Sequence, residues 1–451
     1  MPFPKDFVWG AAAASYQIEG AAYEDGRGLS VWDVFSHTPG KVTAGHTGDV
    51  ACDHYHRYAD DVALMAEIGL QAYRLSVAWP RILPDGTGAV NVAGLDFYDR
   101  LVDTLLAANI TPYVTLFHWD LPFELYLRGG WMNRDSADWF ADYTTAVVGC
   151  LGDRVNHWFT INEPAVFTNV GHKHGRHAPG DRLSDRHLLR MSHNVLRAHG
   201  KAVQAIRATS PQAAQVGIAP DTDVLMPLTQ DEATVDRVRE HYFAMKSVDD
   251  FFNVRFWLDP VIFGEYPADG VALWEEAGIM PPIHDGDMET INQPTDFIGI
   301  NQYRGEYVEV DDDTLTVQQT TVNQPHTQVG WAVRPEILYW GPRFLYERYQ
   351  KPLYITENGL SSMDWVNMDG EVLDHHRIDF TRRHLLQLER AIDDGVPVRG
   401  YFHWSVMDNF EWARGYRERF GMIYVDYDTQ ERILKASAHW YKDVIAANGV
   451  D

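Results

Sequence analysis

Two glutamates at the ends of apolar segments could form a pair of acid–base groups. Glu357 follows "LYIT", a run of apolar and β-branched residues typical of a buried strand, and a turn signal follows it. Glu163 ends the comparable segment "HWFTIN". Cleavage of a glycosidic bond needs two carboxyl groups that flank the substrate, one protonated as the acid and one ionised as the nucleophile. We therefore treat Glu163 and Glu357 as candidate catalytic residues.

Polar residues elsewhere in the chain could set the charge of each glutamate. Arg74 ends another apolar segment, and a nearby cation would keep a carboxylate such as Glu357 ionised. Tyr303 could donate its phenolic hydrogen to the same carboxylate. The apolar context "FTINEP" should raise the pKa of Glu163, and Asn162 can hydrogen-bond a sugar 2-hydroxyl.

Eight short apolar segments would have to position these residues. Near-continuous apolar strands are typical of a parallel sheet that is buried on both faces, and helical patterns separate most of them here. This alternation predicts an α/β fold, a single (β/α)8 TIM barrel domain over residues 1–451. The apolar segments begin at Phe7, Ala72, Thr111, His157, Gln215, Asp296, Leu353 and Val398. The helical patterns cover 56–69, 95–109, 135–149, 187–207, 335–350, 374–394 and 434–447.

The chain is longer than a minimal barrel, and the additional residues fall in its connections. Long connections are uncommon unless they are functional, so we expect long active-site loops at the C-terminal face, where barrel strands end. These connections are 31–54, 166–186, 222–245 and 303–334. The strand ends would bring together Gln17, Arg74, His118, Trp119, Asn162, Glu163, Asn301, Tyr303, Glu357 and Trp404.

The chain is strongly acidic, and this limits its partners. Its 64 Asp and Glu residues against 38 Lys and Arg residues give a formal net charge of −26. Such a charge would repel nucleic acid and anionic lipid, so we expect neither as a partner. No segment reaches membrane-spanning length, and the start "MPFPKDFVWG" has no apolar signal core, which predicts a cytoplasmic location. Cys52 and Cys150 lie far apart and indicate no disulfide framework.

Taken together, the motifs resemble family 1 of the glycoside hydrolases, the β-glucosidase family, over essentially the whole chain. The resemblance implies a retaining exo-β-glycosidase in which Glu163 is the acid/base and Glu357 the nucleophile. It implies neither a metal ion nor an organic cofactor. The matching stretches are "FVWGAAAASYQIEGA" (7–21), "YRLSVAWPRI" (73–82), "FHWDLP" (117–122), "FTINEP" (159–164), "YITENG" (354–359) and "WSVMDNFEW" (404–412).

The resemblance also implies how a sugar would be held. Trp404 would lie beneath the sugar ring with Phe420 as a further aromatic of the pocket, and Trp331 in "QVGW" would be a platform for the leaving group. Asn301, two residues before Tyr303, would support the catalytic pair. The other sugar contacts would come from Gln17, His118, Trp119, Asn162, Glu357, Glu411 and Trp412.

The chain departs from the commoner family pattern at a few positions. Gln302 stands where a second tyrosine is frequent, and Val329 stands where methionine is usual. "NEPAVF" lacks the Trp-Cys pair that often follows the proline in bacterial members. Because of these differences, the resemblance predicts the residues around the leaving group less firmly than those around the sugar.

Other functions are less consistent with the sequence. A metal-dependent barrel hydrolase would use the histidines of "GHKHGRH" (His172, His174 and His177), but the first strand lacks the His-x-His pattern that such enzymes need. A non-catalytic sugar-binding homologue should have lost one glutamate, and a thioglucosidase typically carries glutamine at position 163. Both glutamates are present here.

The expected substrates are unphosphorylated β-glucosides and cello-oligosaccharides, with galactosides and fucosides as further possibilities. A 6-phospho-β-glucosidase is the main alternative, because Arg414, Arg417 and Arg419 follow Glu411 in "NFEWARGYRERFG". A carboxylate at the contact point should repel a phosphate dianion, and phosphoglycosidases of this family carry serine near this position. The sequence leaves the oligomeric state open.

Overall fold

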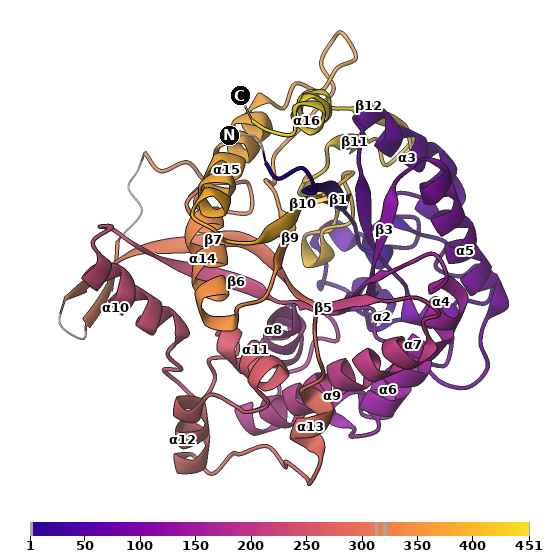
Figure 1. The fold of residues 1–451 in the computed structure, drawn as a ribbon. Helices are drawn as coiled ribbons and strands as arrows, with labels where there is room; N and C mark the ends of the chain where they lie inside the picture. The colour runs from indigo at the N-terminus through magenta and orange to yellow at the C-terminus, as the bar shows by residue number, and fades with distance from the viewer. Residues whose placement is uncertain (1–2, 312–313, 319–322, 451) are drawn as a thin grey trace.

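Eight parallel strands close into a barrel in the part of the chain that the computed structural model describes, residues 3–311, 314–318 and 323–450 (Figure 1). Pairing of β5 with β7 completes the circle. Each strand begins in one of the predicted apolar segments, so the predicted barrel is confirmed. The strands are β1 (Val8–Ala12), β2 (Ala72–Ser76), β3 (Thr111–Phe117), β4 (His157–Asn162), β5 (Gln215–Ala219), β7 (Phe297–Asp311), β9 (Leu353–Asn358) and β10 (Val398–Trp404).

A ring of helices surrounds the barrel (Figure 1). The seven predicted helices all form, and α3 ends at Gly69, whose φ of 84° is the left-handed conformation that a helix C-terminus favours. None of the helices in the described part of the chain is both long and apolar enough to cross a bilayer. The seven helices are α3 (His54–Ile68), α5 (Val92–Ala107), α7 (Ser136–Leu151), α9 (Asp185–Thr209), α14 (Ile337–Tyr349), α15 (His375–Asp393) and α16 (Ala436–Ala447).

The connection between β5 and β7 differs most from expectation. The segment 222–245 was expected as a loop, but it contains most of β6 (Asp221–Pro227) and the helix α10 (Glu232–Phe243). β6 pairs in parallel with the outer half of β7, which continues beyond the barrel. The same connection also holds α11 (Val254–Phe263), α12 (Ala268–Glu276) and α13 (Asp287–Ile291).

The other long connections contain short elements. In the expected loop 303–334, β7 continues and pairs with β8 (Thr314–Val317), and residues 312–313 and 319–322 lie outside the described part of the chain. The remaining short elements are α1 (Ser15–Ile18), α2 (Val31–His37), η1 (Thr43–Gly45), α4 (Trp79–Ile82), α6 (Phe123–Leu127), η2 (Gly130–Met132), α8 (Pro164–Val166), η3 (Phe167–Lys173), η4 (Trp412–Arg417), β11 (Ile423–Val425) and β12 (Arg432–Leu434).

Buried ion pairs hold the segments that follow β9 and β10. Lys435 Nζ lies 2.6 Å from an Asp364 carboxylate oxygen and 2.7 Å from one of Asp408. Arg377 contacts Asp364 at 2.8 Å, and Arg419 contacts Asp408 at 2.6 Å. We call these five residues the buried ion network. Because both partners of each pair are largely removed from water, the network fixes the two segments against each other.

Candidate active site

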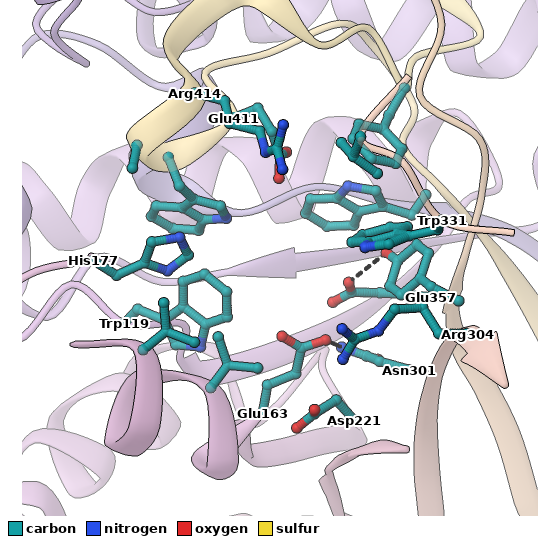
Figure 2. Close-up of a pocket in the computed structure, with 18 of the residues that line it drawn as sticks. Trp119, Glu163, His177, Asp221, Asn301, Arg304, Trp331, Glu357, Glu411 and Arg414 are labelled. Atoms are coloured by element: carbon teal, nitrogen blue, oxygen red, sulfur yellow. Dashed lines mark hydrogen bonds between the residues drawn. The ribbon is translucent and has the colours of Figure 1, made fainter. Parts of the chain in front are cut away.

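A cavity of about 560 Å³ opens at the carboxyl ends of the barrel strands (Figure 2). It contains the candidate catalytic pair and most of the other predicted site residues. Gln17, Arg74 and Asn162 do not line the cavity, but each hydrogen-bonds a residue that does. The predicted residues that line it are His118, Trp119, Glu163, Asn301, Tyr303, Trp331, Glu357, Trp404, Glu411, Trp412 and Phe420.

The Glu357 carboxylate is held by a cation and a phenol. Arg74 Nη1 on β2 donates to Glu357 Oε1 at 2.6 Å, and the Tyr303 hydroxyl on β7 donates to Oε2 at 2.9 Å. Burial raises the pKa of Glu357, whereas Arg74 and Tyr303 oppose this rise because they stabilise the anion. Both partners that the sequence suggested are therefore in contact with this carboxylate.

The Glu163 carboxylate has a different environment. Its hydrogen-bond donor is the neutral side chain of Asn301, whose Nδ2 lies 2.8 Å from Glu163 Oε1. Burial raises the pKa of Glu163 well above its usual range, and the charges of Glu357 and Asp221 add to this effect. The two carboxyl groups thus face one cavity from unequal surroundings (Figure 2). Such an asymmetry suits a protonated acid beside an ionised nucleophile.

Asn162 connects the two halves of the site. Its Oδ1 accepts hydrogen bonds from Arg74 Nη2 at 2.6 Å and from Asn301 Nδ2 at 3.0 Å. Its Nδ2 lies 3.1 Å from Nε2 of His118, and its carbonyl oxygen accepts from Trp119 Nε1 at 3.1 Å. Burial and the nearby Arg74 charge lower the pKa of His118 well below its usual range, so the ring is neutral and can accept this bond.

Gln17 and Glu411 meet at the other end of the cavity. Gln17 Nε2 donates to the Phe410 carbonyl oxygen at 2.9 Å and lies 3.4 Å from Glu411 Oε2. Gln17 Oε1 has no hydrogen-bond partner among the described residues. Burial, with the charges of Glu418 and Glu357, raises the pKa of Glu411 to about 8. A buried acceptor on Gln17 and the half-buried carboxyl group of Glu411 are both available for hydroxyl groups of a ligand.

Aromatic rings form the walls of the cavity. The His118 ring stacks at 5.9 Å from both Trp404 and Trp412. In a second aromatic group, the ring centroids of Trp331 and Tyr303 lie 5.2 Å apart, and those of Trp331 and Phe420 lie 6.3 Å apart. Trp331 therefore packs directly on Tyr303, one of the predicted strand-end residues, and on Phe420.

Replacing Trp331 with alanine should raise the KM for disaccharides about 5- to 10-fold, because a stacking face worth roughly 1–1.5 kcal/mol is lost. Compact aryl glycosides should be affected less, since they contact less of the leaving-group wall. Steady-state kinetics on both substrate types would measure the difference. Trp365→Ala is a matched control, because Trp365 is 70% exposed and does not line the cavity. Equal losses on both substrate types would contradict the proposed platform.

Three residues of the site have a left-handed backbone. The φ angles are 79° at Trp119, 44° at Glu163 and 51° at Trp412. Side chains other than glycine rarely adopt this conformation, and its occurrences cluster at functional sites. At Glu163 the bend comes directly after β4 and turns the chain into α8, so the carboxyl group is directed into the cavity rather than along the sheet.

The sequence did not identify several residues of the cavity wall. Asp221 was not predicted as a site residue, although it lies at the end of the apolar segment that begins at Gln215, and "DVLMP" two residues later has an apolar core that could have suggested β6. Arg304 was not predicted either, although it directly follows Tyr303 on β7. The other lining residues that were not predicted are Val166, Val170, Arg176, His177, Thr222, Asp223, Phe252, Val329, Ala413 and Arg414.

The histidines of the 171–177 segment do not come together. His172 pairs with Asp181 at 3.0 Å, and His174 is exposed. The ring of His177 lies 5.8 Å from that of Trp119 at the cavity wall. Among the described residues, no group of three or more His, Cys, Asp and Glu side chains is arranged to hold a metal ion.

The departure at Gln302 affects packing rather than the cavity. Gln302 is buried, does not line the cavity, and donates from Nε2 to the Thr222 hydroxyl at 3.2 Å. A Cβ atom at Gly341 of α14 would lie 1.8 Å from Gln302 Nε2. Glycine at 341 therefore makes the room for this side chain on the outer face of the barrel.

A parallel barrel whose strand-end cavity contains a pair of buried carboxyl groups in unequal surroundings is an arrangement that glycoside hydrolases use. The family described as "Glycosyl hydrolase family 1" matches residues 1–450, and the chain belongs to this family.

Similar proteins agree with this assignment. A "1,4-beta-D-glucan glucohydrolase" of Thermotoga neapolitana is 48% identical over 451 residues, which are 99% of each chain. A "Bifunctional beta-D-glucosidase/beta-D-fucosidase" of Bifidobacterium breve is 41% identical over 470 residues, 99% of this chain and 98% of that one. The solved structure "Beta-glucosidase from Thermotoga maritima in complex with glucoimidazole" is 46% identical, with a TM-score of 0.90 over 100% of both chains.

Proposed function

We propose that this chain hydrolyses unphosphorylated β-glucosides by double displacement with retention of configuration. The observation that carries the proposal is the unequal pair of buried carboxyl groups, with Glu357 bonded to Arg74 and Tyr303 and Glu163 bonded to Asn301. The names of the family relatives support a β-glucoside substrate. We further propose that residues 1–451 act as one catalytic domain.

Two steps follow from the geometry. First, the Glu357 carboxylate attacks the anomeric carbon while Glu163 gives its proton to the departing oxygen, which leaves a covalent glycosyl ester. Second, Glu163, now ionised, takes a proton from water as the water attacks the anomeric carbon and releases Glu357. Arg74 and Tyr303 act as positioning residues, because they hold the nucleophile ionised and fix its direction.

The sugar would be held at the closed end of the cavity. Gln17 Oε1, which has no partner among the described residues, would accept a sugar hydroxyl, and Glu411 would accept one or two more. Trp404 would stack beneath the ring, and Asn162 would donate to the 2-hydroxyl. Cello-oligosaccharides are proposed as substrates beside simple glucosides, and fucosides and galactosides as further substrates.

A substrate phosphorylated at the 6-hydroxyl should be refused. Burial and nearby charges, chiefly that of Glu418, raise the pKa of Glu411 to about 8. Below this pH Glu411 is protonated and gives a phosphate dianion no positive charge, and above it the carboxylate repels the dianion. Arg414 and Arg417 lie 3.4 and 3.8 Å from Glu418, and Arg419 is bound to Asp408, so these cations already have carboxylate partners.

A side-by-side assay tests the proposed function. The kcat/KM for 4-nitrophenyl β-glucoside should exceed that for its 6-phosphate by about 100-fold or more, because the phosphate dianion would lose its hydration at this wall without gaining an unpaired cation. The first product should be the β-anomer of glucose, which NMR of the fresh reaction would detect. A higher kcat/KM for the phosphorylated substrate, or a first product with the α configuration, would contradict the proposal.

A further inference from the structure

Asp221 is a buried carboxyl group of the cavity that the proposed mechanism does not use. It begins β6, lines the cavity and is only 9% exposed. In the sheet it is the register partner of Asn301, the residue that donates to Glu163. Figure 2 shows its carboxyl group on the same side of the cavity as that of Glu163. Asp221 Oδ1 has no hydrogen-bond partner among the described residues.

A purely structural role explains Asp221 poorly. A buried carboxyl group with an unpaired oxygen costs free energy, so a structural aspartate would be expected to have its oxygens bonded. Asp223, two residues further along β6, shows the contrast, because Arg304 Nε lies 2.9 Å from its Oδ1 and its side chain is 49% exposed. Arg304 therefore pairs with Asp223, and Asp221 remains without an ion-pair partner among the described residues.

We propose that Asp221 is a positioning residue for the acid step, whose charge keeps the proton on Glu163 until the leaving group receives it. The proposal rests on the proposed role of Glu163 as the acid. The carboxylate of Asp221 never needs to touch the substrate for this effect, because the interaction acts through the low-dielectric wall that both groups share.

The charges around Glu163 support this assignment. Asp221 adds to the rise in the pKa of Glu163 that burial and Glu357 produce, and Arg74 and the Asn301 amide oppose it. The charges of Asp221 and Glu357 differ in one respect: Glu357 loses its charge when the glycosyl ester forms, and Asp221 does not. The titratable or charged groups that face this part of the cavity are Arg74 on β2, His118 after β3, Asp221 and Asp223 on β6, Tyr303 and Arg304 on β7, Glu357 on β9, Glu411 and Arg414 after β10, and Arg176 and His177 after η3.

The direction of the effect follows from the sign of the charge. Glycosylation needs protonated Glu163, so its rate falls as the pH rises through the pKa of that group. Burial raises the pKa of Asp221 to about 7, and above this value Asp221 is anionic and opposes loss of the Glu163 proton. Asp221→Asn should therefore move the alkaline limb of kcat/KM to lower pH by about one unit, while the rate on the acid side is retained.

The experiment compares pH profiles of kcat/KM on two substrates. Phenyl β-glucoside has a poor leaving group that needs the acid, and 2,4-dinitrophenyl β-glucoside has one that does not. The alkaline limb of Asp221→Asn should move only with phenyl β-glucoside. Asp221→Glu should restore the wild-type limb, and Asp223→Asn should move it by much less, because water and Arg304 already screen that charge. Asp221→Ser serves as the uncharged variant if Asp221→Asn does not fold.

Each outcome bears on one proposal. The role of Asp221 would be overturned if the alkaline limb of kcat/KM lay at the same pH in the uncharged variants as in the wild type, or if Asp223→Asn shifted it equally. A shift that also appears with 2,4-dinitrophenyl β-glucoside would do the same, because that substrate does not report the acid. If the wild-type limb is identical on the two substrates, Glu163 is not the acid, and the proposed function itself fails.

Discussion

Replacement of Glu357 with alanine should reduce kcat by roughly 10⁵-fold or more, the loss expected when a covalent nucleophile is removed. Both steps of the proposed reaction pass through the ester on this carboxylate, so no partial route remains. Arg74 and Tyr303 would lose their shared partner, and a thermal unfolding measurement would show whether the variant remains folded. Activity assays at high enzyme concentration would measure the residual rate.

Two further measurements identify the atom that attacks. In the wild type, a 2-deoxy-2-fluoro glucoside with a good leaving group should label Glu357, which peptide mass spectrometry would locate. Glu163→Gln is the matched control, because it removes the other buried carboxyl group and should leave the labelled position unchanged. In Glu357→Ala, azide should attack from the vacated face and give the α-glucosyl azide. Labelling of another carboxylate would exclude Glu357 as the nucleophile.

Replacement of Glu163 with alanine should separate substrates by their leaving groups. Glucosides with poor leaving groups should lose about 10²- to 10⁴-fold in kcat/KM, the usual contribution of a general acid. Those with activated phenols should still form the glycosyl ester, because such phenolates depart without a proton. The ester should then accumulate, since no base remains to activate water, and a burst of phenol release would reveal it.

Azide tests the second role of Glu163. It needs no base, so it should accelerate breakdown of the ester in Glu163→Ala and give the β-glucosyl azide. This product has the opposite configuration to the one expected from Glu357→Ala, so the two variants control each other. An equal loss on all leaving groups, or an α-azide from Glu163→Ala, would contradict the assignment of Glu163 as the acid/base.

The sequence was sufficient to predict the barrel and to predict that Glu163 and Glu357 face one cavity. The strands are continuous apolar runs, and parallel strands all end at one face, so Glu357, Arg74 and Tyr303 had to approach each other. The hydrogen bond of Asn301 to Glu163 joins the ends of β7 and β4, which both pair with β5 and end at the same face of the barrel.

Features that depend on long-range geometry could not be predicted. β6 forms where β7 continues past the barrel and offers it a parallel edge, and the apolar core of "DVLMP" does not indicate which strand it would pair with. The position of Asp221 beside Asn301 at the cavity therefore became evident only from the structure. The left-handed backbone at Trp119 and Trp412 is likewise set by the tertiary structure, since tryptophan has no local preference for this conformation.

The buried ion network also affects the wall of the proposed sugar site. Asp408 accepts a hydrogen bond from the backbone N–H of Gly421 at 2.9 Å, and Arg377 donates one to the carbonyl oxygen of Arg419 at 2.9 Å. The network therefore holds the chain on both sides of Phe420. The conformational entropy of this wall is therefore lost once, when the chain folds, and not again at each turnover. We therefore expect this wall to have the same conformation before and after a ligand binds.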